Sequence, residues 1–255
     1  MLKKTLLLTS GLLIIFLSST LTRVDRTPYK TLDFYKKSIH EINQLLTKNP
    51  SRSIGDTLLI GFARANLTPS ELAPLAGYGN RRPKEMTSVH DSIYVNTTVI
   101  NNGKNKIAIV SADLLIIPPE VTALLKEKLF NTGWSLPEIF LSATHTHSSL
   151  GGWAPGLVGN MIAGTYNAKY PEFIANQIVA SIQMAEKRLN AGAWSFNELS
   201  IPSLINNRLV GTQGITDPSL KLMALKSGMQ EGVHVFYGAH ATCLSGENKQ
   251  MSRDY

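Results

Sequence analysis

Cysteine is almost absent from this 255-residue chain, which contains a single one, Cys243. One cysteine excludes an internal disulfide framework and any zinc site built from four thiolates. Charge is also sparse, since charged residues make up 17% of the chain and hydrophobic residues 43%. That balance excludes an intrinsically disordered chain and predicts a folded domain with an ordinary hydrophobic core.

A dense basic patch is also missing. The formal net charge is +7, but the four Lys and Arg residues and the one Asp of residues 1–26 already account for +3 of it. The rest of the chain therefore carries only about +4. A dedicated nucleic-acid binder would concentrate its positive charge on one face, so we expect no nucleic-acid partner.

Several familiar catalytic motifs do not occur in the sequence. There is no Walker phosphate loop, no Gly-x-Ser-x-Gly nucleophile elbow and no His-Glu-x-x-His zinc motif. The His-x-His-x-Asp-His pattern of metallo-β-lactamase-type hydrolases requires Asp and His at the positions that Ser149 and Leu150 occupy here. These absences disfavour the corresponding enzyme classes and leave other histidine arrangements as the candidates for chemistry.

The N-terminus begins with Lys3 and Lys4 and continues with an uncharged run over residues 5–22. A helix of that length spans about 27 Å, close to the roughly 30 Å hydrocarbon core of a bilayer. We therefore expect residues 1–26 to be a membrane anchor or a signal peptide, and a buried helix is a third alternative. The first two interpretations place the following domain outside the cytoplasm, in a bacterial-type cell envelope, with the N-terminal segment in contact with the membrane.

The patterns after residue 26 predict a stalk followed by one α/β domain. Residues 31–46 repeat apolar positions at helical spacing, so residues 27–55 are expected to form a stalk helix and linker. Strands that alternate with helices and also pair locally indicate a mixed β-sheet with helices packed on it, over residues 56–255. The strands are expected at 57–65, 92–100, 106–113, 138–143, 193–200, 221–226 and 233–238, with a hairpin over 92–113, and the helices at 118–133 and 171–189.

The residues that can carry chemistry gather where predicted strands end. His145 and His147 follow the strand at 138–143, and His240 follows the strand at 233–238. On an extended backbone, residues two apart point to the same side, so the paired imidazoles can face one cavity. Neutral imidazole is the commonest metal ligand, and zinc takes three or four such groups. The alternative is a pair of hydrogen-bonded structural histidines at a strand end.

Two further residues are candidates for supporting roles. Asp113 ends the strand at 106–113, where its carboxylate could orient a ligating imidazole or cap the following turn. Arg208 lies in a predicted loop, where it could hold a polar headgroup or be an ordinary exposed arginine. The other histidines have plain structural explanations: His40, His90 and His234.

Several segments together resemble the neutral/alkaline non-lysosomal ceramidase family, and they follow one another in the same order. The Thr-His-Thr-His-Ser block around His145 and His147 is the most specific of them. The resemblance covers about residues 57–255 and identifies this region with the N-terminal part of a larger catalytic domain. The matching segments are 61–69, 77–79, 89–94, 110–113, 143–152, 207–208, 236–240 and 252–255.

The resemblance implies a zinc amidohydrolase that cleaves the N-acyl bond of ceramide to give a sphingosine-type base and a fatty acid. By motif position, His145 and His240 would be zinc ligands, and His147 would face the scissile amide. Arg208 and the backbone at Gly77 would contact the polar head of the substrate. The implied cofactor is therefore Zn²⁺, and the implied partner is a ceramide-like lipid.

The chain also departs from the family pattern. In the family, a Glu and a Tyr that complete the zinc site, and a serine, come after the segment that residues 252–255 resemble. We therefore expect an incomplete catalytic domain, a fragment that is inactive by itself. Other functions stay open: a zinc hydrolase of another amide, or a non-enzymatic or decayed envelope protein that binds lipid or metal without turnover.

Overall fold

The computed structural model describes residues 2–20, 26–48, 57–81 and 84–254. Its contacts divide the chain into two units, Met1–Arg52 and Ser53–Tyr255. The first unit contains helices α1 (Leu2–Thr20) and α2 (Asp33–Lys48), with a short 3-10 turn at Tyr29–Thr31. Helix α2 corresponds to the helix expected at 31–46. The linker expected after it falls on residues 49–55, which lie outside the described part of the chain.

Helix α1 covers most of the segment for which an anchor or a signal peptide was predicted. It exposes large apolar side chains over residues 12–17. Within the part of the chain that the structure describes, no helix combines the length and the hydrophobicity needed to cross a membrane. The end of the predicted segment, residues 21–25, lies outside the described residues.

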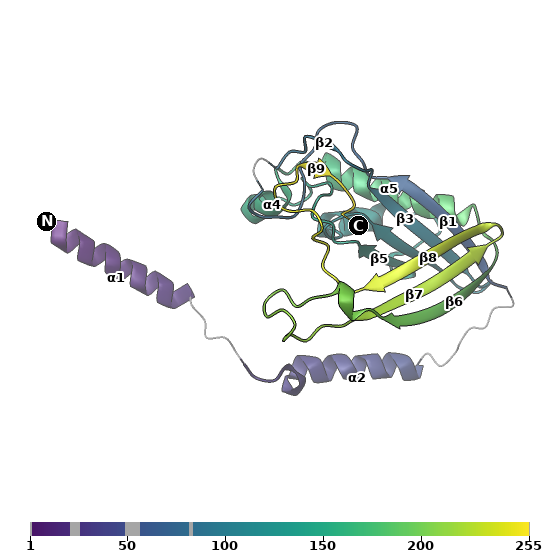
Figure 1. Cartoon of the computed structure of the whole chain (residues 1–255), viewed down its shortest axis with the longest axis horizontal. Helices are drawn as coiled ribbons and strands as arrows, with labels where there is room; N and C mark the ends of the chain where they lie inside the picture. Colours follow the sequence, from purple (N-terminus) through teal and green to yellow (C-terminus); the bar gives the residue numbers. More distant parts are fainter. Residues whose placement is uncertain (1, 21–25, 49–56, 82–83, 255) are drawn as a thin grey trace. The chain divides into compact units, whose positions relative to one another are not determined.

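The second unit is built around a mixed β-sheet, as predicted (Figure 1). Its described strands are β1 (Leu59–Asn66), β3 (Tyr94–Asn101), β4 (Lys106–Ala112), β5 (Ile139–Ala143), β6 (Asn190–Ser200), β7 (Ser219–Ser227) and β8 (Gln230–Tyr237). They lie in the order β5-β4-β3-β1-β6-β7-β8. Strands β4 and β5 are parallel, and every other neighbouring pair is antiparallel. A separate parallel pair joins β2 (Ser88–Val89) to β9 (Gln250–Met251).

Strands β3 and β4 form the predicted hairpin, and the turn residues explain why it forms there. The side chain of Asn102 accepts hydrogen bonds from the N–H groups of Lys104 and Asn105, which closes the turn locally. Gly103 has φ +86°, a conformation that glycine adopts without steric cost. The β-branched strands on both sides then pair in register from Val95 opposite Ala112 to the turn.

Two helices cover one face of this sheet. Helix α5 (Lys169–Glu186) packs on β1, β3 and the smaller α3 (Pro119–Lys128), and it lies behind β1 and β3 in Figure 1. Its stripe of Ile174, Ile178 and Ile182 is fully buried, as helical spacing predicted. Gly61 permits the close approach, because an added Cβ would lie 2.0 Å from the carbonyl oxygen of Ala185.

The far end of the sheet bends back over its centre. Strand β8 is not a neighbour of β3, yet the Nε2 atom of His234 on β8 lies 2.9 Å from the Oγ1 atom of Thr98 on β3. Gly232 lies so close to Phe62 of β1 that an added Cβ would be 2.8 Å from the ring. The bend carries the loop after β8 toward the loops that follow β4 and β5.

Helix α4 (Gly156–Ala163) and strand β5 differ from the sequence expectations. Helix α4 was not predicted, because its glycines and short length give no helical period to recognise; it begins after Pro155 and ends at Gly164, which has φ +78°. Strand β5 was expected to be buried, but only Ile139 of it is. The reason is that β5 forms the edge of the sheet.

The buried stripe of α5 gives a direct test of the fold. We expect Ile178→Ala to lower the free energy of unfolding by about 3 kcal/mol, because it removes a fully buried side chain and leaves a cavity against the sheet. Asn176→Ala, at an exposed position of the same helix, should change it by less than about 0.5 kcal/mol. Urea unfolding of both variants measures the difference, and equal losses would contradict this packing.

Candidate metal centre and adjoining pocket

The parallel pair β4 and β5 positions the first histidine. Because parallel strands end at the same edge of a sheet, the segments that leave them meet: the Thr144 N–H donates to the Ala112 carbonyl, and the His145 N–H donates to that of Leu114. The Nδ1 atom of His145 lies 2.7 Å from the carbonyl oxygen of Leu115. A carbonyl only accepts, so Nδ1 is the donor, and the lone pair of Nε2 is available to a metal.

Two hydrogen bonds with the C-terminal segment hold the loop after His145 in place. The hydroxyl of Thr146 donates to the carbonyl of Ser252, and the N–H of Ser252 donates to the carbonyl of Ser148, both at 2.9 Å. His145 has φ +64°, so the backbone is not the simple extended strand that the sequence argument assumed. The rings of His145 and His147 nevertheless lie on one side, with centroids 5.0 Å apart.

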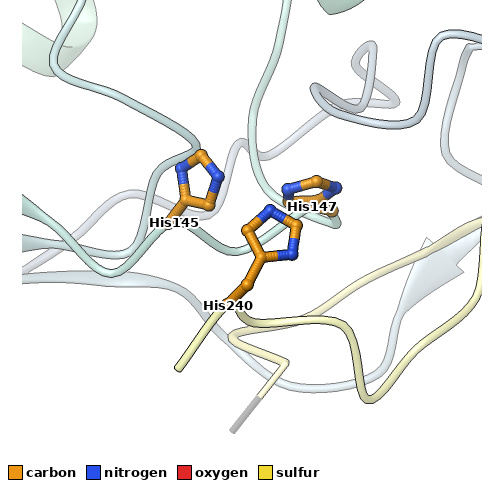
Figure 2. A group of neighbouring side chains, drawn as sticks. All are labelled: His145, His147 and His240. Carbon is orange, nitrogen blue, oxygen red and sulfur yellow. The ribbon is translucent and has the colours of Figure 1, made fainter. Parts of the chain in front are cut away.

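The loop after β8 adds the third imidazole (Figure 2). The His240 ring centroid lies 4.8 Å from that of His145 and 4.7 Å from that of His147. One ligand atom from each ring can be chosen so that all three lie within 4.8 Å of one another. The structure thus brings together the three histidines that the sequence singled out, although His240 comes from the far end of the sheet.

The cluster favours neutral rings, which are the metal-binding form of imidazole. The pKa of His147 is lowered to about 4, first by burial and then by the neighbouring His240, His145, Arg81 and Arg208, in that order. The pKa of His240 is also lowered, first by burial and then by His145 and Arg208. Proton competition for these two rings is therefore weak at neutral pH.

His147 provides the observation that tests whether a metal fits. Both of its ring nitrogens are buried and have no hydrogen-bond partner among the described residues. Buried polar atoms in folded proteins are nearly always satisfied, by protein, water or an ion. Three imidazoles that face one point, one of them with unsatisfied nitrogens, match the donor set that zinc prefers.

Gly77 lies against this loop for a steric reason. It has φ +93°, and an added Cβ would lie 2.8 Å from the Cα, Cβ and carbonyl oxygen of His147. Its N–H donates to the Ile162 carbonyl, and its own carbonyl accepts from Lys84. Both backbone polar groups therefore have partners in this structure. The contact with a substrate head that the sequence suggested for Gly77 stays a prediction.

The two supporting candidates fare differently. Arg208 is exposed on the loop before β7, close enough to lower the pKa of His147 and His240 through its positive charge. Asp113 is 4% exposed, and its Oδ2 atom accepts the N–H of Tyr94 at 2.9 Å. Burial raises the pKa of this carboxyl. The Nδ1 atom of His145 contacts the backbone carbonyl of Leu115, and the imidazole-orienting role expected of Asp113 stays a prediction.

Two residues beside the cluster were missed as site residues. The Tyr78 ring makes an edge contact with His147 at a centroid distance of 4.7 Å, and burial followed by the Asp254 carboxylate raises its pKa. Arg81 is 2% exposed and donates to the His147 carbonyl at 2.8 Å. Tyr78 lies in the matched block at 77–79, which was a usable signal. A buried arginine in a loop has no such signal in one sequence.

An apolar pocket opens directly beside the histidines. It has a volume of about 600 Å³ and includes His145 and His147 in its wall. Helix α4 supplies one side of it and the segment of Gly77 and Tyr78 another. The apolar side chains that line it are Leu115, Ile116, Pro119, Trp153, Ala154, Pro155, Val158 and Ile162. The arrangement suits an extended hydrocarbon group that ends at the imidazoles.

The two glycines of this wall form a matched pair for mutation. We expect Gly77→Ala to lower the free energy of unfolding by about 1–3 kcal/mol and to weaken zinc binding, because the new methyl group displaces the His147 backbone, and with it the loop that carries His145, and the positive φ is strained. Gly79→Ala should change neither quantity measurably, since nothing lies within 4 Å of its added Cβ. Thermal unfolding and zinc titration of both variants test this; equal behaviour would contradict the close approach at Gly77.

Comparisons with known proteins agree on one family. Residues 58–255 match the family described as neutral/alkaline non-lysosomal ceramidase, N-terminal. The curated neutral ceramidase of Pseudomonas aeruginosa is 25% identical over 224 residues, which cover 80% of this chain and 33% of that protein. This chain therefore spans about a third of the length of the curated relative.

Solved structures show the same fold. A structure described as ceramidase complexed with C2 superposes with a TM-score of 0.68 at 21% identity, over 77% of this chain and 33% of that one. A crystal structure of neutral ceramidase from Pseudomonas aeruginosa gives a TM-score of 0.66 at 22% identity, over 77% and 34% of the two chains. These likenesses confirm the predicted fold class. The match over residues 58–255 shows that the chain belongs to the neutral/alkaline non-lysosomal ceramidase family.

Proposed function

We propose that this chain carries part of a zinc-dependent amidohydrolase that cleaves the N-acyl bond of ceramide or a related lipid amide. The proposal rests on one observation above all: the cluster of His145, His147 and His240 lies at the edge of an apolar pocket. Membership of a ceramidase family supports the same conclusion. Because the chain spans about a third of its relatives, the activity is proposed for the whole protein.

In this proposal His145 and His240 hold the zinc ion. His145 is already oriented for it, since the Leu115 carbonyl fixes its tautomer and leaves Nε2 to bind metal. His240 has a lowered pKa and is therefore neutral at neutral pH. When bound, zinc supplies Lewis acidity, which polarises a carbonyl group and makes water a nucleophile at neutral pH.

His147 is proposed to face the scissile amide. With a pKa of about 4 it is neutral at physiological pH, so one ring nitrogen can donate a hydrogen bond and the other can accept one. Both nitrogens have no partner among the described residues, which leaves them to substrate or water. The ring can then orient the nucleophile or pass a proton to the departing amine.

The surroundings are proposed to select a lipid amide. The apolar wall of the pocket would bury a hydrocarbon chain and gain about 0.8 kcal/mol per buried methylene group. Arg208 is exposed near the imidazoles and would contact the polar head together with the backbone at Gly77. Asp113 would act only indirectly, by fixing the chain at Tyr94 beneath the site.

The cell envelope or the exterior is the proposed location. The support is the basic start at Lys3 and Lys4 followed by the uncharged run over residues 5–22, which is typical of an export segment. In this proposal residues 56–255 are the catalytic part, and residues 27–55 connect it to the N-terminal segment.

Metal binding tests the ligand assignment. We expect His145→Ala and His240→Ala to weaken Zn²⁺ binding by at least about 100-fold, because each removes a ligand, and His147→Ala to weaken it by less than about tenfold. His90→Ala, which changes a histidine outside the cluster, is the matched control. Equilibrium dialysis measures all four variants. A loss for His147→Ala as large as for His145→Ala would make His147 a third ligand rather than the substrate-facing ring.

Ceramide hydrolysis tests the reaction. The assay uses a fluorescent short-chain ceramide with the purified chain and with the complete product of its gene. We expect the complete product to release fatty acid only with zinc present, and His147→Ala to lower the rate by about 100-fold or more, as loss of a general acid–base group does. Ceramide that is bound without release would instead support the binding-only alternative, and cleavage of other amides alone would indicate a different zinc hydrolase.

A further inference from the structure

Lys84 is a buried cation that contacts the backbone of the pocket walls from outside the cavity. Its residue is only 6% exposed, although an ammonium group is costly to remove from water unless all its hydrogen bonds are made. The Nζ atom lies 2.7 Å from the Gly77 carbonyl, 2.8 Å from that of Tyr78 and 3.1 Å from that of Ile162. An ammonium group has three donors, and three backbone carbonyls accept them.

These three carbonyls belong to two different walls of the pocket. Gly77 and Tyr78 form the wall that touches His147, whereas Ile162 lies near the C-terminal end of α4 on the other wall. A single backbone hydrogen bond, from the Gly77 N–H to the Ile162 carbonyl at 3.1 Å, also joins the two walls. Lys84 therefore ties together, from outside the cavity, the two segments between which a ligand would lie.

Its neighbour Arg81 makes a different connection. The guanidinium donates to the carbonyls of Ala76 and His147, so it links the Gly77 wall to the histidine loop. Arg81 therefore fixes the Gly77–Tyr78 wall to the histidine loop, and Lys84 sets the distance of that wall from α4.

We propose that Lys84 is a positioning residue that fixes the width of the pocket, and thereby the hydrocarbon chains that it accepts, by clamping the Gly77–Tyr78 wall to the end of α4. The proposal deepens the proposed function and rests on it, since it takes the pocket to be the lipid-chain site. Lys84 does not line the cavity itself, so its effect on binding is exerted through the two walls.

The hydrogen bonds of the Lys84 ammonium group can be removed without removing the backbone hydrogen bonds around it. The Tyr78 carbonyl also accepts the N–H of Arg81, and the Ile162 carbonyl also accepts that of Gly77. Replacing Lys84 by Met keeps the length and apolar stem of the side chain and leaves those backbone hydrogen bonds in place. The main loss is the ammonium group that holds three carbonyls at one point.

The test measures pocket binding and metal binding separately on the full chain. Dansyl-labelled undecanoic acid serves as the pocket probe, and Zn²⁺ titration reports on the histidines. We expect Lys84→Met to weaken probe binding by about tenfold, because a pocket with mobile walls must be ordered by its ligand, while zinc affinity stays within about threefold. Lys84→Arg, which keeps a cation with several donors, should recover part of the probe affinity. Lys104→Met, in an exposed turn, should behave like the wild type.

Two results would overturn the proposal. One is a folded Lys84→Met variant that binds the probe as tightly as the wild type. The other is a parallel fall of probe affinity, zinc affinity and unfolding temperature, which would mean a general structural role. If Lys84→Met does not fold, Lys84→Gln retains two donors and should weaken probe binding by about threefold; wild-type affinity in that variant would also overturn the proposal. Probe binding needs no turnover, so failure of the amidase function would not be mistaken for failure of the clamp.

Discussion

The parallel pairing of β4 with β5 is the constraint on which the site depends. It brings two strand ends to the same edge of the sheet, so that the carbonyl of Leu115 meets the Nδ1 atom of His145. That hydrogen bond fixes both the tautomer and the direction of the ring. The bend of the sheet brings in the third histidine, because His240 can reach His145 only when β8 lies over β3.

Buried cations near the site lose their hydration, and hydrogen bonds to backbone carbonyls offset that free-energy cost. Arg81 and Lys84 are both under 10% exposed, and each donates to backbone carbonyls of the surrounding segments. A buried cation without such acceptors would be strongly destabilising, so these contacts hold the loops in one conformation. The same burial keeps His147 neutral, because charge on its ring would lie among like charges in a poorly solvated place. Burial therefore accounts both for the fixed conformation of the pocket walls and for the neutral state of His147.

Much of this arrangement could be predicted from the sequence. The stripe of Ile174, Ile178 and Ile182 and the hairpin turn at Gly103 are local patterns, and local patterns fix local structure. The placement of histidines after two predicted strands also identified the cluster, as did the resemblance of the surrounding blocks to ceramidases. The site roles of these residues remain predictions.

The features that the sequence could not predict depend on contacts between residues far apart in the chain. The contact of His145 with Leu115 spans 30 residues, and nothing local favours that carbonyl over the carboxylate of Asp113. The clamp at Lys84 reaches Ile162 across 78 residues, from a loop with no helical or strand period. Helix α4 could not be predicted because its short apolar run includes two glycines, which are poor helix formers. Such features follow from tertiary packing, which overrides local propensity.

X-ray absorption at the zinc edge of the metal-loaded chain tests the central claim most directly, because it reports the atoms bound to the ion without requiring turnover. The account predicts a first coordination shell with at least two imidazole nitrogens at about 2.0–2.1 Å, with the outer-shell scattering that is typical of histidine rings. A shell of oxygen atoms alone, or a spectrum unchanged by His145→Ala and His240→Ala, would contradict it.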